Sequence, residues 1–347
     1  TYKIAASGKH FLGYSDPKSG WDRTPALLPM QQIHEFFRPP FQAAIDSGLK
    51  TIMLNSGELN GRPVHSDKDI VTDLLREQMG FDGVIVTDWA DIKKLVNHHY
   101  TARNMKEATH QAIQAGIDMS MTPNDLSFND ALLELVEEGK VTEERINESV
   151  RRILRLKFEL DIFEHPFPAK RFDQVGAPEH KEQALQAARE SIVLLKNEKE
   201  TLPLSSDLDN IVLVGPSADS KMNLSGGWTI TWQGGPEERF PEEMETLYDA
   251  LGNQFPNASI TVQDSLPATS KDRKQLLKNA RNADAVIFAL GEKPYAEMPG
   301  NINTLNLPEH QAELVHLFKD VKTPKVMVMR RLMWLRILPF LFPPKGM

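Results

Sequence analysis

The chain has 347 residues, with 40 Lys and Arg against 48 Asp and Glu and a net charge of −8. This mild acidity, spread without long runs of one sign, argues against nucleic acid or an anionic membrane as the main partner. The sequence has no cysteine, which excludes disulfide scaffolds, thiolate metal sites and cysteine nucleophiles. With 40% hydrophobic and 25% charged residues, a chain of this length predicts a globular protein of two domains.

The first half of the chain alternates between predicted strands and helices. The spacing of its apolar residues predicts strands at 2–6, 50–55, 83–87 and 117–121, and helices at 29–48, 67–79, 105–115, 128–138 and 142–160. Ser66 is placed to cap the helix at 67–79. About four βα units are too few to close a barrel, which needs eight parallel strands. The pattern therefore fits either an open sheet or the second half of a barrel.

A second α/β region is predicted after a linker at 161–179 that is rich in Pro, Phe and charge. Predicted helices at 180–190, 242–251, 271–282 and 309–319 alternate with strands at 191–195, 210–214, 259–262, 283–290 and 325–329. The tail at 330–347 changes to basic and apolar residues with prolines. Its apolar stretch of about eleven residues is shorter than the roughly 20 that a membrane span needs. We thus predict four segments: 1–160, 161–179, 180–329 and 330–347.

The strongest local signal is an apolar strand that ends in a carboxylate followed by an aromatic residue, in GFDGVIVTDW at 80–89. In βα folds the carboxyl ends of the strands carry the site, so Asp88 stands where catalytic groups stand. Capping the next helix is the alternative role for this aspartate. Lys9 and His10, predicted to come just after the first strand, would lie on the same rim and could donate hydrogen bonds to a polyhydroxylated ligand.

Two loops of the second region carry further candidates. Trp228 and Trp232 lie in GGWTITWQG at 226–234, and indole faces suit the apolar faces of sugar rings, although packing into a local core is the alternative. Glu292 and Glu297 lie in GEKPYAEMPG at 291–300, directly after a predicted strand. These two carboxylates are either ordinary solvated charge or an acid that reaches over the pocket of another domain.

In this order, the motifs resemble the β-glucosidase-like members of glycoside hydrolase family 3, from about residue 2 to about residue 329. Those similar to its barrel domain are KHF at 9–11, NG-PVH at 60–65, TDLLR at 72–76, GFDGVIVTDW at 80–89, AGIDMSM at 115–121 and RRILRLKFELDIFE at 151–164. Those similar to its second domain are ESIVLLKN at 190–197, GGWTITWQG and GEKPYAEMPG. The resemblance implies the second half of a (β/α)8-type barrel domain followed by an α/β sandwich domain.

The resemblance also implies a reaction: hydrolysis of terminal β-D-glucosyl residues by a retaining, exo-acting β-glucosidase. Asp88 is implied as the nucleophile and Glu297 as the general acid/base, with Glu292 as the fallback. Retaining glycosidases use two carboxylates about 5–5.5 Å apart, one attacking the anomeric carbon and one protonating the leaving oxygen. Such chemistry requires neither a metal ion nor an organic cofactor.

The remaining candidates are implied as sugar ligands. Lys9 and His10 resemble the residues that hold the hydroxyl groups of the terminal sugar. Trp89 and Trp232 resemble the aromatic pair that clamps the next sugar, with Trp228 beside them. The implied partners are therefore β-glucosides or oligosaccharides, and neither nucleic acid nor a membrane.

The sequence departs from the family pattern at both ends. Family members begin well before KHF, so the first half of the barrel is expected to be missing, and the likeness stops near Arg330. Thr1 is not an initiator methionine, and no signal-peptide pattern follows it. We therefore expect the 347-residue chain alone to be weakly active or inactive. The sequence leaves its cell compartment undecided. It also leaves open whether the chain forms a homo-oligomer or pairs with a complementing fragment.

Three alternatives remain. An N-acetyl-β-glucosaminidase or a β-xylosidase of the same family is one, although the residues after His10 lack the Pro-Gly-His pattern of the former. A non-catalytic sugar-binding fragment is the second. An unrelated hydrolase or nucleotide binder is the third, but no GxSxG, HExxH, Walker or GxGxxG pattern is present.

Overall fold

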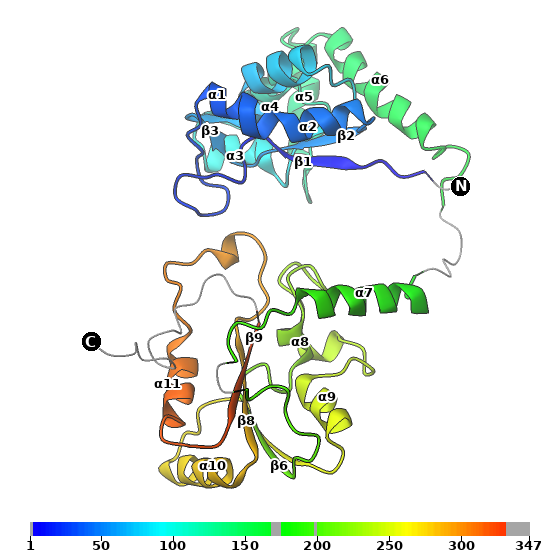
Figure 1. The fold of residues 1–347 in the computed structure, drawn as a ribbon. Coiled ribbons are helices and arrows are strands. Elements are labelled where there is room, and N and C mark those ends of the chain that lie inside the picture. Colours follow the sequence, from blue (N-terminus) through cyan, green and yellow to red (C-terminus); the bar gives the residue numbers. More distant parts are fainter. Residues whose placement is uncertain (1–2, 168–174, 198–199, 331–347) are drawn as a thin grey trace. The chain divides into compact units, whose positions relative to one another are not determined.

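A computed structural model describes residues 3–167, 175–197 and 200–330, in two compact units (Figure 1). The first unit is Thr1–Val175 and the second is Gly176–Met347, so the division falls within the predicted linker at 161–179. The predicted tail at 330–347, apart from Arg330, lies outside the described residues. Among those that are described, no helix is long and apolar enough to cross a bilayer.

The first unit is built on a parallel sheet in the order β1-β2-β5. Strands β2 (Thr51–Leu54) and β5 (Val84–Val86) confirm two predicted strands. The prediction of a strand at 2–6 is wrong, because β1 spans Ser7–Phe11. Pairing with β2 buries the Phe11 side chain completely, whereas Ile4 is 90% exposed. Lys9 and His10 consequently lie within the strand and not after it.

The helices that cover this sheet largely match the predictions. Their bounds are α1 (Met30–Gln32), η1 (Ile33–Phe37), α2 (Arg38–Asp46), η2 (Val64–Ser66), η3 (Asp69–Gln78), α3 (Asp91–Asn97), α4 (Met105–Ala115), α5 (Ser127–Glu137) and α6 (Glu143–Glu159). The predicted Ser66 cap is wrong: the hydroxyl of Ser66 donates to the carbonyl of Pro63 (3.1 Å). Asp67 accepts the backbone N–H of Asp69 instead (3.1 Å). One large apolar cluster joins the sheet to its helices and fixes the ends of its strands.

A tight hairpin follows β2 and is formed by β3 (Glu58–Leu59) and β4 (Arg62–Pro63). Asn60 and Gly61, at its tip, have positive φ values of 52° and 83°, as a type I′ turn requires. The Asn60 side chain bonds the backbone N–H and C=O of Leu28, each at 2.8 Å. This NG pair therefore ties a hairpin to the long segment that leads into α1.

The predicted strand at 117–121 is reduced to one parallel bridge, between Met119 and Val86. The buried carboxylate of Asp118 also holds the segment in place. This group accepts hydrogen bonds from Ile85 N (2.9 Å) and Ser149 Oγ (2.7 Å) and pairs with Arg76 and Arg152. Side-chain bonds to Asp118 thus add to the backbone hydrogen bonds that join this segment to β5 and the turn after it.

Substituting Asp118→Asn is expected to destabilise the first unit by about 3–5 kcal/mol, because it removes the carboxylate that pairs with the largely buried Arg76 and one of the two that pair with Arg152. Burial already lowers the pKa of Arg76 to about 10 despite the carboxylate beside it. Urea unfolding followed by circular dichroism measures the loss. Asp69→Asn is the matched control, because Asp69 is 70% exposed in its pair with Arg62 and should contribute less than about 1 kcal/mol. Equal effects would contradict the assignment.

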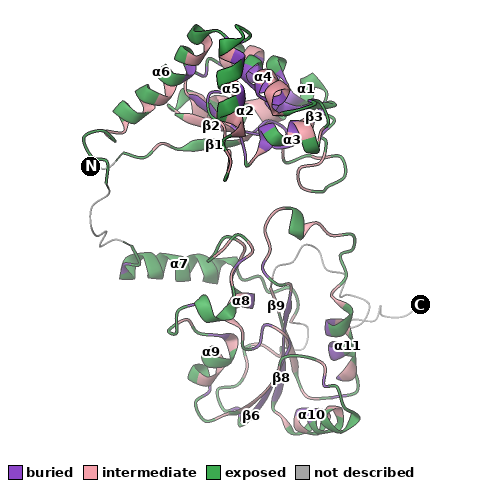
Figure 2. Cartoon of the chain, turned by 180° about the vertical axis from the view of Figure 1, so that it is seen from behind, coloured by how far each residue is buried: buried purple, intermediate pink, exposed green. Residues whose placement is uncertain are grey.

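The second unit is a four-stranded parallel sheet in the order β7-β6-β8-β9. Its strands are β6 (Asn210–Val214), β7 (Ser259–Gln263), β8 (Ala285–Gly291) and β9 (Lys325–Arg330). Helices α10 (Ser270–Asn282) and α11 (Glu309–Leu317) pack in one apolar cluster, and α9 (Leu247–Gln254) packs in another. Every residue of β8 is buried between these layers, as Figure 2 shows. The remaining helices are α7 (Pro178–Ser191), α8 (Lys221–Leu224), η4 (Glu237–Arg239) and η5 (Met298–Gly300).

Two predictions for this unit are wrong. The helix predicted at 242–251 begins only at Leu247, where Thr246 and Asp249 form a capping box. The strand predicted at 191–195 is absent, and Ile192 to Leu195 are 65–78% exposed. The apolar run has the composition of a strand, but no described strand pairs with it, and a strand needs a partner to form.

Candidate functional site

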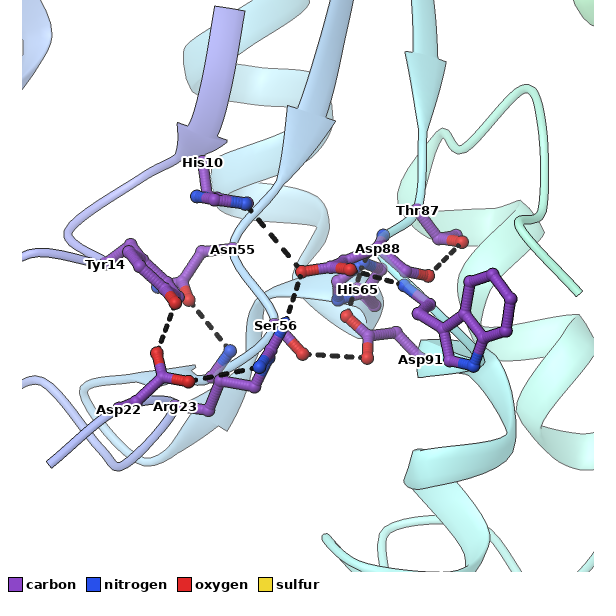
Figure 3. A network of polar contacts seen from close by, with 12 residues as sticks. His10, Tyr14, Asp22, Arg23, Asn55, Ser56, His65, Thr87, Asp88 and Asp91 are labelled. Atoms are coloured by element: carbon purple, nitrogen blue, oxygen red, sulfur yellow. Dashed lines mark hydrogen bonds and ion pairs between the residues drawn. The ribbon is translucent and has the colours of Figure 1, made fainter. Parts of the chain in front are cut away.

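Asp88 lies two residues beyond β5, at the carboxyl end of the parallel sheet, and is 7% exposed. Both of its carboxylate oxygens have partners (Figure 3). The backbone N–H of Trp89 donates to Oδ1 (2.5 Å), and Arg23 Nη2 donates to Oδ2 (3.3 Å). A buried carboxylate held by an N–H group and a guanidinium is restrained in both position and charge.

His10 completes a closed ring of contacts around Asp88. Its Nε2 lies 3.8 Å from Asp88 Oδ2, and its ring packs on Tyr14 with centroids 4.4 Å apart. Tyr14 donates its hydroxyl to Asp22, and Asp22 Oδ2 accepts from Arg23 Nη1 (3.1 Å). Since Arg23 in turn reaches Asp88, five side chains from β1, the loop after it and the end of β5 fix one another.

The electrostatics of this ring favour an ionised Asp88 beside a neutral His10. Burial acts to raise the pKa of Asp88, but the Trp89 N–H and the Arg23 charge outweigh it, so that the pKa lies below its ordinary value. Burial and the nearby Lys9 charge lower the pKa of His10 despite the Asp88 carboxylate. An ionised carboxylate at a strand end is suited to nucleophilic attack.

The alternative role of Asp88, a helix cap, is wrong. Helix α3 begins after Ala90, which has a φ of 58°, and no side chain caps it. The turn between β5 and α3 is tied instead to the segment at 119–121: Thr87 N donates to Met119 O (3.0 Å), and Ala90 N to Met121 O (2.9 Å). This leaves the Asp88 carboxylate available to the site.

Two other predicted residues of the first unit lie on its surface. Trp89, next to Asp88, is 57% exposed, and Lys9 in β1 is exposed. Their positions fit residues that contact a ligand from the rim. The sequence reasoning missed Tyr14, Asp22 and Arg23, which surround Asp88, because they lie in a loop whose path no periodic pattern predicts.

In the second unit, the loop with Glu292 and Glu297 follows β8. Gln311 of α11, which is 3% exposed, anchors the start of this loop through Gly291, donating to its carbonyl (2.7 Å) and accepting from its N–H (3.1 Å). Glu292 accepts the hydroxyl of Tyr295 at 2.9 Å. Glu297 is half-buried, and its φ of 57° places it in the left-handed region. Strained residues of this kind cluster at functional sites.

The predicted tryptophan loop lies against the acidic loop. Gln233 donates to the carbonyl of Ala296 and accepts its N–H, both at 3.0 Å. Within the tryptophan loop, the N–H of Trp228 donates to the carbonyl of Trp232 (3.1 Å), and the two indoles are 68% and 40% exposed. Packing of the pair into a local core, the alternative, is therefore wrong.

Substituting Gly227→Ala is expected to separate these two loops. An added Cβ would lie 2.4 Å from the carbonyl oxygen of Tyr295, a backbone atom that cannot move without shifting the acidic loop. We expect a fall of about 100-fold in any turnover that depends on Glu297, because displacing a catalytic group by about 1 Å costs that much. Gly252→Ala, which meets nothing within 4 Å, is the control. Equal rates for the two variants, measured beside their melting temperatures, would contradict the expectation.

The structure thus brings His10 together with Asp88 in one unit, and Trp228 and Trp232 together with the Glu297 loop in the other. Within the described part of the chain, no group of three or more His, Asp or Glu side chains could hold a metal ion. A βα sheet that ends in an ionised aspartate, followed by an α/β sandwich with paired aromatic and acidic loops, is the combination expected of a two-domain glycoside hydrolase.

Comparison with known families makes this assignment specific. The model of the glycosyl hydrolase family 3 N terminal domain matches residues 1–156, and that of the C-terminal domain matches residues 192–340. The chain therefore belongs to glycosyl hydrolase family 3. This confirms the predicted fold class, part of a barrel-type domain followed by an α/β sandwich domain.

Similar proteins include enzymes named for two different sugars. A lysosomal beta glucosidase from Dictyostelium discoideum is 41% identical over 93% of this chain and 41% of its own length. A beta-xylosidase from Formosa agariphila is 27% identical over 94% of the chain and 47% of its own. The crystal structure of a beta-glucosidase from Listeria innocua with glucose matches with a TM-score of 0.82 and 32% identity, over 94% of this chain and 44% of that one. The chain thus spans less than half the length of these relatives.

Proposed function

We propose that this chain carries the catalytic residues of a retaining, exo-acting β-glucosidase. The observation that supports this most is Asp88 itself: a buried carboxylate at a strand end, kept ionised by Arg23 and the Trp89 N–H. Glu297 is the proposed acid/base. Glu292, in the same loop, is the fallback, and its carboxylate accepts the Tyr295 hydroxyl.

The proposed reaction has two displacement steps. An oxygen of Asp88 attacks the anomeric carbon while Glu297 protonates the departing glycosidic oxygen, which gives a glycosyl-enzyme ester and the released alcohol. Glu297, now ionised, takes a proton from water as that water attacks the same carbon and releases Asp88. Two inversions give net retention, and the scheme requires the two carboxyl groups to approach to about 5–5.5 Å.

The proposed substrates are β-glucosides or oligosaccharides with a terminal β-D-glucosyl residue. The Listeria innocua enzyme has been solved with glucose and with gluconolactone, which supports the same glycone here. His10, neutral and beside Asp88, can donate one hydrogen bond to a sugar hydroxyl, and Lys9 can donate from the rim. Trp89, Trp228 and Trp232 are the proposed platforms for the next sugar. The alternative glycone is xylose, because a beta-xylosidase is among the relatives.

We further propose that the 347-residue chain alone hydrolyses glucosides slowly or not at all, since the relatives that it matches are more than twice its length. Pairing with a complementing fragment or with a second copy is the proposed route to higher activity. Neither route changes the roles proposed for Asp88 and Glu297.

Covalent labelling tests the proposal in a chain of low activity. A dinitrophenyl 2-deoxy-2-fluoro-β-D-glucoside forms a slowly hydrolysed ester with the nucleophile of a retaining enzyme, and mass spectrometry locates it after a single turnover. We expect the label on the peptide that contains Asp88, and faster labelling by the glucoside than by the matching xyloside. Faster labelling by the xyloside would favour the alternative glycone. A label on another residue would refute Asp88 as the nucleophile, and gluconolactone binding without any label would favour a sugar-binding fragment.

A further inference from the structure

Three polar side chains, each 2% exposed, lie directly behind Asp88: Ser56, His65 and Asp91. Asp91 Oδ1 accepts the hydroxyl of Ser56 (2.8 Å) and the ammonium of Lys94 (2.5 Å). Lys94 also donates to Ser56 Oγ (3.0 Å), so the three groups form a closed triangle. A buried carboxylate with this many donors is fixed in place, and the proposed reaction assigns it no role.

The other oxygen of Asp91 lies beside His65, the ring that contacts the backbone amide of Asp88. His65 Nε2 lies 3.2 Å from Asp91 Oδ2 and 3.4 Å from the backbone nitrogen of Asp88 (Figure 3). Burial lowers the pKa of His65 despite the charges of Asp91 and Asp88, so the ring is neutral. The Asp88 N–H donates to this ring nitrogen, which therefore cannot also donate to Asp91 Oδ2, a buried oxygen with no hydrogen-bond partner among the described residues.

The backbone between these residues is strained. Ala90 has a φ of 58°, a conformation that costs an L-residue about 1–2 kcal/mol. The Asp88 carbonyl accepts the hydroxyl of Thr87 (2.8 Å), and the N–H of Asp91 approaches it at 3.4 Å. Asp91 therefore lies at the end of the turn that orients Asp88, with its side chain in contact with the ring that accepts the Asp88 N–H.

We propose that Asp91 is a positioning residue for the nucleophile: through His65 and the Asp88–Asp91 turn, it sets the direction in which the Asp88 carboxylate points. This inference rests on the proposed function of Asp88. It predicts that changing Asp91 slows attack on the sugar while the affinity for a bound sugar stays the same. A role in stability alone predicts a loss of folded protein, with normal attack by the molecules that remain folded.

The test compares Asp91→Asn with the double variant Asp91→Asn, Lys94→Met, both in the full chain. The single variant leaves the largely buried Lys94 ammonium without the carboxylate that pairs with it, whereas the double variant removes both charges. Leu135→Ala, in a separate apolar cluster, is the control for stability. Three quantities are measured: the melting temperature, the labelling rate with the dinitrophenyl fluoroglucoside, and the affinity for gluconolactone.

We expect both Asp91 variants to label about 10- to 100-fold more slowly with an unchanged affinity for gluconolactone, because a small misplacement of a reacting group has costs of this size. The double variant should have a higher melting temperature than Asp91→Asn but the same slow labelling rate. Leu135→Ala should have a lower melting temperature than the unaltered chain and a normal labelling rate. Recovery of the rate in the double variant, or a normal rate in Asp91→Asn, would overturn the inference. If Asp91→Asn does not fold, Ser56→Ala decides: a fall of about threefold or more supports the inference, and an unchanged rate overturns it.

Failure of the proposed function would look different, because the unaltered chain would then show no label at all. In that case the role of Asp91 is tested by the rate of amide hydrogen exchange in the peptide that contains Asp88. Faster exchange in Asp91→Asn, with unchanged exchange in Leu135→Ala, supports a positioning role for Asp91. Equal exchange in the unaltered chain and in Asp91→Asn overturns that role.

Discussion

Substituting Asp88→Asn is expected to abolish labelling by the fluoroglucoside and to lower any hydrolysis by a thousandfold or more, which corresponds to about 4 kcal/mol of transition-state stabilisation. The amide keeps the shape of the side chain, and its oxygen can still accept the Trp89 N–H. It lacks the negative charge that attacks the anomeric carbon, and it places an NH2 group where Arg23 now meets a carboxylate oxygen. Labelling followed by mass spectrometry, beside hydrolysis of an aryl β-glucoside, measures the loss.

Asp82→Asn is the matched control for this substitution. Asp82 lies in the same motif, but its side chain is 68% exposed in ion pairs with Arg152 and Arg155. We expect its labelling rate to stay within about twofold of the unaltered chain, since exposed pairs contribute little. Equal losses in the two variants would show that the motif matters for folding and would remove the support for Asp88 as nucleophile.

The pH dependence of labelling gives an independent check on Asp88. Its pKa lies below the ordinary value because the Trp89 N–H and Arg23 outweigh the effect of burial. The ionised form therefore persists as the pH falls through the range in which a free aspartate is protonated. We expect labelling to decline at a lower pH than the ordinary pKa of an aspartate would give, and a decline that begins near neutral pH would contradict the electrostatic account.

The strand that positions Asp88 could be predicted because its evidence is local. Val84, Ile85 and Val86 form the continuous apolar run that is typical of a buried strand, and the carboxylate of Asp88 follows two residues later. The placement of β1 failed, because its bounds depend on pairing with β2, a partner more than 40 positions away. Local composition favoured the residues before it, which include the exposed Ile4.

The partners of Asp88 could not be predicted for the same physical reason. Arg23 is 65 positions from Asp88, in a loop without periodicity, and its charge alone did not distinguish it from other arginines. Asp91 lies in a helix that was not predicted, and its burial beside Ser56 and His65 follows only from the fold. Such contacts are set by the tertiary fold, whereas motif spacing reports only what lies near in sequence.

The choice between Glu297 and Glu292 can be decided by the leaving group of the substrate. Glu297→Gln is expected to slow the hydrolysis of unactivated β-glucosides by about 100- to 10,000-fold, because departure of an alkoxide requires a proton from the acid. With dinitrophenolate as leaving group, glycosylation needs no proton, so the labelling of Asp88 should change little. Turnover of the dinitrophenyl glucoside should then be limited by the second step, where the base is missing.

Azide separates an acid/base role from damage to the loop. As an anion it attacks the glycosyl-enzyme without giving up a proton, so it should restore turnover in Glu297→Gln and yield β-glucosyl azide with retained configuration. Glu292→Gln loses only the carboxylate that accepts the Tyr295 hydroxyl, and it should show neither the leaving-group dependence nor the rescue. The reverse result would transfer the role to Glu292. Rescue in neither variant would mean that the proton donor lies outside this loop.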